Sequence, residues 1–116
     1  MSNINAMPTY TTKALDEPVA ANTAAVVTIA APGAKRRIVI DQVQWSYDAA
    51  PTGGKLTIAE NGVTCHSLYI MNGGPAVIGK PVEFATNVPV VVTLAAAGAG
   101  VKGSVSVDYY IRRVPG

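Results

Sequence analysis

The chain has 116 residues, which is enough for one domain and too few for a second of ordinary size. Only 14% of the residues are charged and the net charge is +2. A nucleic-acid-binding domain usually carries a stripe of Lys and Arg, so we expect no nucleic-acid partner. The single cysteine, Cys65, provides neither a disulfide framework nor a cysteine-based metal site. No apolar run approaches the roughly 18 residues of a membrane helix, and we expect no membrane partner.

Residues 1–20 differ in composition from the rest and sustain no helical or strand period. We therefore predict an extended N-terminal arm over 1–20 and a folded domain over 21–116. Lys13-Ala14-Leu15 could add a short strand. The segment from Met1 to Thr12 lacks the apolar stretch of a signal peptide, which, with the lone cysteine, favours assembly in the cytoplasm. The apolar residues scattered in the arm would remain exposed to water unless the arm lies against the domain or a neighbouring subunit. They are therefore interface candidates: Ile4, Met7, Tyr10 and Leu15.

Two strands are expected next, over Ala24–Ala30 and Arg37–Tyr47. The first is a β-branched run closed by Pro32-Gly33. In the second, Ile38 and Ile40 share one face, whereas Val43, Trp45 and Tyr47 share a face of opposite parity. The shift falls at Asp41-Gln42, which predicts a β-bulge or a bend there.

A hairpin follows the loop at 48–54. Lys55–Glu60 alternates in hydrophobicity, and Val63–Ile70 is the expected return strand. Asn61-Gly62 between them accepts positive φ at both positions and predicts a type I′ turn. Further extended pieces are expected over Val77–Phe84, split by Gly79-Lys80-Pro81, and over Val88–Leu94.

The last strand, Val101–Arg112, shows strict alternation over a dozen residues. No window supports a helix of normal length. Roughly eight short strands at close spacing predict an all-β protein, a single β-sandwich that is jelly-roll-like and preceded by the N-terminal arm. An immunoglobulin-like sandwich is the alternative topology.

The residues that could carry chemistry do not form a recognisable motif. Cys65 and His66 are neighbours on a strand and would point to opposite faces, so we expect Cys65 to be a small buried hydrophobe and His66 an exposed strand residue. The acids are dispersed, and the glycine pairs fit β-turns better than a phosphate-binding loop. The sequence therefore predicts no catalytic residues, no metal site, no cofactor and no small-molecule substrate.

Two groups of aromatic residues are candidates for a binding surface. Trp45 and Tyr47 could stack on a sugar, but core packing is favoured because Val43 continues the same row. Tyr110 differs, since it lies on the polar face of the last strand with Ser106 and Arg112. Tyr and Arg are enriched in protein interfaces, so Tyr110 and Arg112 are interface candidates.

Two segments resemble a recurrent group of small tailed-phage and prophage proteins. Residues 45–58, WSYDAAPTGGKLTI, are similar to a signature of the form SYxAAPTGGKLTI, with Asp48 where Ser is usual. Residues 92–105, VTLAAAGAGVKGSV, resemble the VTLAAxGAGVxG ending of the same group. The resemblance spans about residues 35–110, and it leaves out the arm.

The resemblance implies a virion structural protein, and a small β-sandwich with an arm is similar to capsid decoration, or cement, proteins. Such proteins commonly sit on the capsid exterior as trimers and bridge neighbouring major capsid protein subunits. We therefore expect a non-enzymatic protein that is assembled in the bacterial cytoplasm, with the major capsid protein as its partner and a homotrimer favoured. The alternatives are a virion-displayed module that binds carbohydrate or a host surface, and a head–tail connector or tail component.

Overall fold

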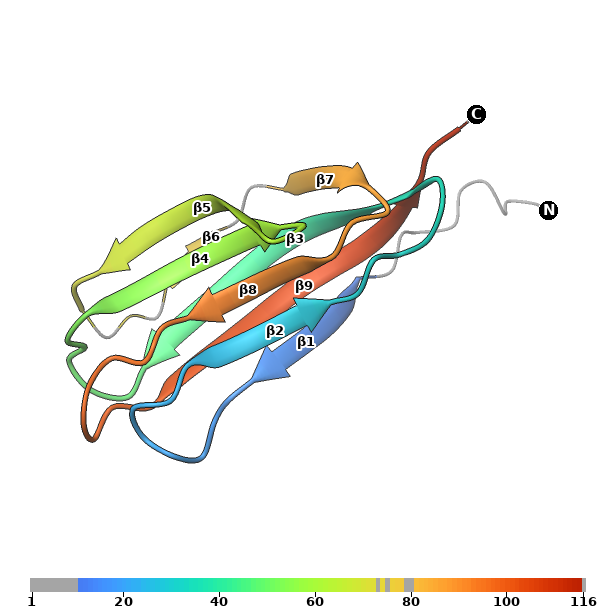
Figure 1. The fold of residues 1–116 in the computed structure, drawn as a ribbon. Coiled ribbons are helices and arrows are strands. Elements are labelled where there is room, and N and C mark those ends of the chain that lie inside the picture. The colour runs from blue at the N-terminus through green and yellow to red at the C-terminus, as the bar shows by residue number, and fades with distance from the viewer. Residues whose placement is uncertain (1–10, 73, 75, 79–80, 116) are drawn as a thin grey trace.

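The computed structural model describes residues 11–115 except 73, 75, 79 and 80. In these residues the chain forms strands and turns, with no helix, as two layers of antiparallel sheet (Figure 1). The strands of the described chain are β1 (Thr12–Asp16), β2 (Ala25–Ile29), β3 (Arg36–Tyr47), β4 (Gly54–Glu60), β5 (Val63–Ile70), β6 (Ala76–Ile78), β7 (Val82–Thr86), β8 (Val90–Leu94) and β9 (Gly103–Arg113).

The first sheet has the order β1-β9-β3, and the far side of β3 is shared by β6 and β7. This sharing is possible because β3 is 12 residues long. Arg37 to Ile40 pair with β7, and Val43 to Trp45 pair with β6. The short strand expected at Lys13–Leu15 is confirmed as β1, which pairs with β9 and so belongs to the sandwich.

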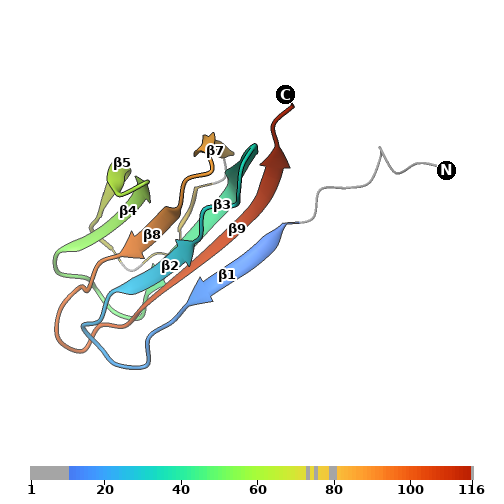
Figure 2. The same cartoon turned by 45° about the vertical axis from the view of Figure 1, so that its right-hand side comes forward.

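The second sheet has the order β2-β8-β4-β5. Figure 2 shows the two layers from the side, with β5 at one margin and β1 at the other. The first three connections, β1 to β2, β2 to β3 and β3 to β4, each cross between the sheets. With β6 and β7 together in the place of one strand, this order is that of a jelly roll. The predicted β-sandwich with jelly-roll topology is therefore confirmed.

The core lies between the sheets and is built from the inward-facing residues of β2, β3, β4, β5, β7, β8 and β9, together with Ala97 and Val101 from the loops. In β3 the alternation changes parity at the predicted place, because the register with β9 shifts between Ile40 and Gln42. The bulge lets both halves of β3 face the core, and Trp45 and Tyr47 are buried there rather than exposed for sugar stacking. The buried core residues are Ala25, Val27, Ile29, Ile38, Ile40, Val43, Trp45, Tyr47, Leu56, Ile58, Ile70, Phe84, Val90, Val92, Leu94, Ala97, Val101, Val105 and Val107.

The predicted hairpin turn is confirmed at Asn61 and Gly62, whose φ angles are 50° and 85°. The return strand β5 is less regular than expected. Its register against β4 shifts between Ile58 and Ala59, because Ile58 faces His66 whereas Ala59 faces Thr64. Cys65 is the extra residue, so β5 contains a bulge and runs regularly from His66 to Ile70.

One end of the sandwich is closed by residues 45–58 and 92–105. The Tyr47 hydroxyl donates to the Ala95 carbonyl over 2.7 Å. The backbone N–H of Thr52 donates to the Ala97 carbonyl over 2.8 Å, and the N–H of Asp48 donates to the Lys102 carbonyl over 2.9 Å. Residues 45–58 and 92–105 therefore form one structural corner that ties the two sheets together.

Candidate functional surfaces

The described interface candidates lie on one surface, the outer face of the first sheet. The register places Leu15 opposite Ser106 and so on the same side as Tyr110 and Arg112. Leu15 is 65% exposed, Arg112 is exposed and Tyr110 is half-buried. Tyr110 lies directly opposite Val39, which is buried on this outer face although it is not part of the core. The other candidates, Ile4, Met7 and Tyr10, lie outside the described residues.

This outer face, here called the charged face, carries two ion-paired groups. Lys13 Nζ lies 3.2 Å from Asp108 Oδ1. Further along, Glu83 accepts from Arg112 Nε over 2.8 Å and also from Arg112 Nη2, and Arg37 Nη1 lies 3.6 Å from the same carboxylate. Arg112 is therefore exposed, but its guanidinium is already bound to Glu83. It is less available to a partner than the sequence indicated.

The pair of arginines around Glu83 should contribute little to stability. All three side chains are more than a third exposed, and exposed ion pairs are worth about 0–1 kcal/mol. We expect Glu83→Gln to lower the free energy of unfolding by less than about 1 kcal/mol, as measured by chemical denaturation. A larger loss that persists in high salt would mean that Glu83 has a packing role beyond its charge.

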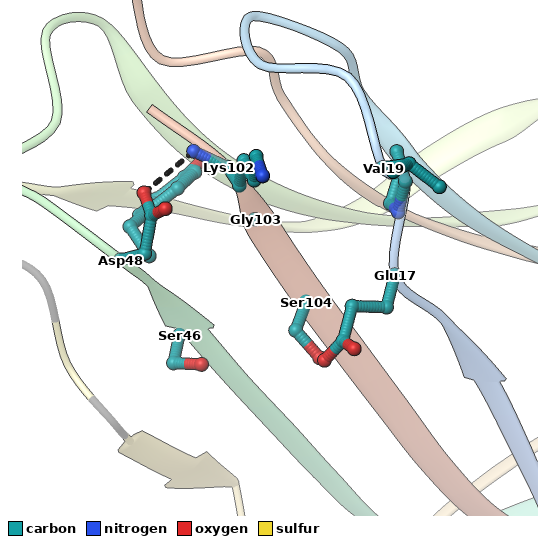
Figure 3. A pocket seen from close by; sticks show the side chains of 9 residues that line it. Glu17, Val19, Ser46, Asp48, Lys102, Gly103 and Ser104 are labelled. Carbon is teal, nitrogen blue, oxygen red and sulfur yellow. Dashed lines mark hydrogen bonds between the residues drawn. The ribbon is translucent and has the colours of Figure 1, made fainter. Parts of the chain in front are cut away.

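The charged face also has a shallow pocket, at the end near the closing corner (Figure 3). Glu17 and Val19 border it on one side, and Ser46 and Ser104 lie on neighbouring strands at its floor. Asp48 borders it on the other side, but its carboxylate accepts the Lys102 N–H over 2.7 Å. Asp48 thus serves the loop, as is usual for carboxylates at turns.

Other carboxylates of the described chain also bind backbone groups. Asp16 of β1 accepts the Val26 N–H of β2 over 2.7 Å, and Glu60 of β4 accepts the Ala85 N–H of β7 over 2.6 Å. Both bonds join one sheet to the other. Among the residues that the structure describes, no three His, Cys, Asp or Glu side chains gather as a metal site would need. These acids hold the two layers together.

The expected burial of Cys65 is wrong. Cys65 is exposed, because β5 is an edge strand and the cysteine is the extra residue of its bulge. Its thiol donates to the Ile58 carbonyl over 3.3 Å. His66 is exposed, as predicted.

Cys65 should react with a thiol reagent in the folded protein. Partial burial of the sulfur, with a smaller contribution from the nearby Glu60 carboxylate, raises the pKa of Cys65 above its ordinary value of 9.0. We therefore expect full modification without denaturant, at a rate that is slow near neutral pH and rises through the alkaline range as thiolate forms. Absorbance of the released chromophore measures the rate. A thiol that reacts only after unfolding would contradict the exposed position.

Sequence reasoning missed the outer face of the second sheet. Cross-strand register places two rows of small apolar and hydroxyl side chains there. Lys55 is the only charged residue among them, and its Nζ lies 5.0 Å above the ring of the exposed Tyr69. This surface, here called the threonine face, consists of Val26, Thr28, Lys55, Thr57, Ala59, Thr64, Ser67, Tyr69, Val91 and Thr93. The signal was available, since the outward positions of these four predicted strands contain a single charged residue, Lys55.

In the described part of the chain, no helix has the length and apolar character needed to cross a membrane.

Comparison with known proteins gives no family assignment: neither a protein family nor a curated protein matches the sequence. The solved structures with a similar arrangement include dimeric latent PorU from Porphyromonas gingivalis, at 10% identity over 92% of this chain, with a TM-score of 0.48. The chain spans 13% of the length of that PorU chain.

Two carbohydrate-binding modules are also similar in arrangement. One is module CBM36 in complex with calcium and xylotriose, at 16% identity over 77% of this chain and 71% of that chain, with a TM-score of 0.37. The other is the CBM36-1 domain of a multidomain xylanase from the hindgut metagenome of Trinervitermes trinervoides, at 12% identity over 90% of this chain and 99% of that chain, with a TM-score of 0.41. At these values the likeness says nothing about ligand or activity.

Proposed function

We propose that the chain is a phage virion structural protein, a capsid decoration protein on the capsid exterior that bridges major capsid protein subunits and acts without catalysis. The observation that supports this proposal is the threonine face, which spans four strands and carries one charged residue, Lys55. A protein partner can cover such a face without desolvating ions, whose burial is costly. The phage-like segments at 45–58 and 92–105 supply the virion context.

Attachment by this face would be mostly a matter of shape and apolar contact. Val26, Thr28 and Tyr69 are exposed, and their neighbours on β4 and β8 are half-buried, so side chains of the partner can reach the whole width of the sheet. Each contact can be weak because a capsid offers many identical sites, and an oligomer that engages several of them gains effective affinity. The residues that precede β1 would add a second point of attachment on a neighbouring subunit.

The first argument for the glycan-binding alternative no longer holds, because Trp45 and Tyr47 lie in the core and cannot stack on a sugar.

The connector or tail alternative differs from a decoration protein in its copy number per particle. Quantitative protein analysis of purified particles from the phage that encodes this chain should find hundreds of copies for a decoration protein and about a dozen or fewer for a connector. Particles without the chain would contradict a virion role.

The face itself is tested with a matched pair of variants. Thr93 lies in the interior of the threonine face, and Ser106 lies in a comparable half-buried position on the charged face. We expect Thr93→Lys to weaken binding to capsids that lack the protein by at least about tenfold, because it places a charge in the apolar contact, whereas Ser106→Lys should bind normally. Binding is measured by co-sedimentation, after denaturation curves have shown that both variants fold. The reverse result would mean that the charged face is the attachment surface.

A further inference from the structure

The edge strand β5 is unlike the other margins of the sandwich. It ends the order of the second sheet, so one side of its backbone has no neighbouring strand among the described residues. It is eight residues long, with the sequence VTCHSLYI, and contains no Asp, Glu, Lys, Arg or Pro. A long, uncharged edge strand presents free N–H and C=O groups and is a template for pairing with another strand.

The other margins carry features that oppose such pairing. At β2 the N–H of Val26 is already used by the Asp16 carboxylate, which reaches it from β1. The edge strand β1 carries Lys13 and Asp16 among its five residues. Beyond β3, the margin is divided between the short strands β6 and β7, and Glu83 lies on β7. Charges, short edge strands and bulges are among the devices by which proteins protect sheet edges. β5 has neither charges nor a short length, and its one bulge lies at Cys65.

The bulge at Cys65 limits how much of β5 can pair, because a bulge bends the strand and interrupts a regular ladder. His66 to Ile70 continue in regular register with β4. The pairing segment is therefore this five-residue stretch, which is long enough for a ladder of backbone hydrogen bonds.

Exposed apolar side chains gather on this same strand. Leu68 is 44% exposed and Tyr69 is 73% exposed, and Val63 and Met71 are exposed at either end of β5. Leu68 lies opposite the buried Leu56, so it points to the core side of the sheet. A shallow hollow there is lined by Leu56, Ile58, His66 and Leu68. The margin of the core is therefore open at β5, and a further strand would cover it.

We propose that β5 pairs antiparallel with β5 of a second copy of this chain, across a two-fold axis near Leu68. The absence of charge favours a second copy as the occupant, because a strand that meets itself brings like charges together unless it has none. The pairing joins the β2-β8-β4-β5 sheets of the two copies into one continuous sheet, and the threonine face continues across it. The assembly has two-fold symmetry in place of the expected trimer. The proposal concerns self-association and stands apart from the capsid role.

Charged variants at the axis test the pairing. We expect the unmodified chain to be a dimer by sedimentation equilibrium. Leu68→Lys alone and Leu68→Glu alone should each raise the dimer dissociation constant by at least about tenfold, because like charges meet and apolar burial is lost. An equimolar mixture of the two should dimerise again. Ser106→Lys, on the outer face of the other sheet and away from β5, is the control and should dimerise as the unmodified chain does.

A distance measurement provides an independent test with the chain's own single cysteine. Cys65 is three positions from Leu68, so two spin labels would be six strand residues apart along the joint, about 20 Å between Cα atoms at 3.4 Å per residue. Pulsed electron paramagnetic resonance should show a short distance of this order in the unmodified chain and none in Leu68→Lys. A monomer at all concentrations, a trimer, or a dimer that keeps its affinity in Leu68→Lys would overturn the proposal.

Discussion

Replacing Tyr47 with alanine should lower the free energy of unfolding by about 3–5 kcal/mol, as is usual for a large buried aromatic side chain. The Tyr47 ring lies at the closing corner, where a Cβ added to Gly54 would stand 3.1 Å from Cε2 and one added to Gly103 would stand 3.2 Å from Cε1. The ring thus fills the space between two glycines on different sheets. Alanine would leave a cavity that the backbone of neither strand can close.

The hydroxyl of Tyr47 makes a separate, smaller contribution. It donates to the Ala95 carbonyl over 2.7 Å, so Tyr47→Phe should cost about 1 kcal/mol by leaving that acceptor without its partner. Guanidinium titrations followed by the fluorescence of Trp45, whose ring centroid lies 6.3 Å from that of Tyr47, measure both variants. A phenylalanine variant as unstable as the alanine variant would mean that the hydrogen bond, rather than the ring, closes the corner.

Titration of the Tyr47 hydroxyl makes the free energy of unfolding depend on pH. Burial raises the pKa of Tyr47 above its ordinary value of 10.0, and a backbone hydrogen bond with Lys55 acts in the opposite direction. The unfolded chain therefore loses this proton at lower pH than the folded chain does. The contribution to stability is complete below pH 10 and is lost as the pH rises from there toward the folded pKa. The unmodified chain should lose its advantage over Tyr47→Phe across that range, since the other tyrosines are common to both.

The alternation of residues was sufficient to predict most of the fold. In β3, and in β9 as far as Val107, the side chains that alternate toward one face are buried, and the parity shift near Gln42 located the bulge correctly. A strand with one face on a core must alternate, because a slip of one residue would expose its whole apolar set. The jelly-roll order followed from the number and spacing of strands, although no single strand determines it.

The misplaced residue, Cys65, shows where this reasoning fails. The alternation of residues along a strand predicts which side chains share a face, but it does not predict whether another layer covers that face. β5 lies at the margin, so even Leu68, which points to the core side, is 44% exposed. Its alternation is also broken by a bulge that sequence could not locate. The threonine face was overlooked for a related reason, because no single strand contains it and only the register of four strands assembles it.

Residues 45–58 and 92–105 contain the side chains that close the corner. Tyr47 and Gly54 come from the first segment, and Ala95 and Gly103 come from the second. Their contacts show that both segments serve the fold. The surfaces proposed for attachment and pairing lie mostly on other residues, so the two segments stabilise the sandwich and leave the choice of partner to other parts of the chain.

Gly103 provides the sharpest test of that corner. A Cβ at this position would stand 2.8 Å from Leu94 Cδ2 and 3.2 Å from Tyr47 Cε1, so Gly103→Ala should cost about 1–3 kcal/mol through overpacking. Ser104→Ala, the next residue and outward-facing, is the control and should change stability by less than about 0.5 kcal/mol. Leu94→Val removes the Cδ atoms that would collide.

The double variant of Gly103→Ala with Leu94→Val should lose less stability than the sum of the two single losses, because the second change makes room for the first. Denaturation curves of the four proteins measure this coupling. Strictly additive losses would show that Leu94 does not clash with the added methyl group. The Tyr47 ring alone would then be the reason that position 103 needs glycine. In that case, Gly103→Ala should instead be relieved in Tyr47→Ala, where the space beside the added methyl group is empty.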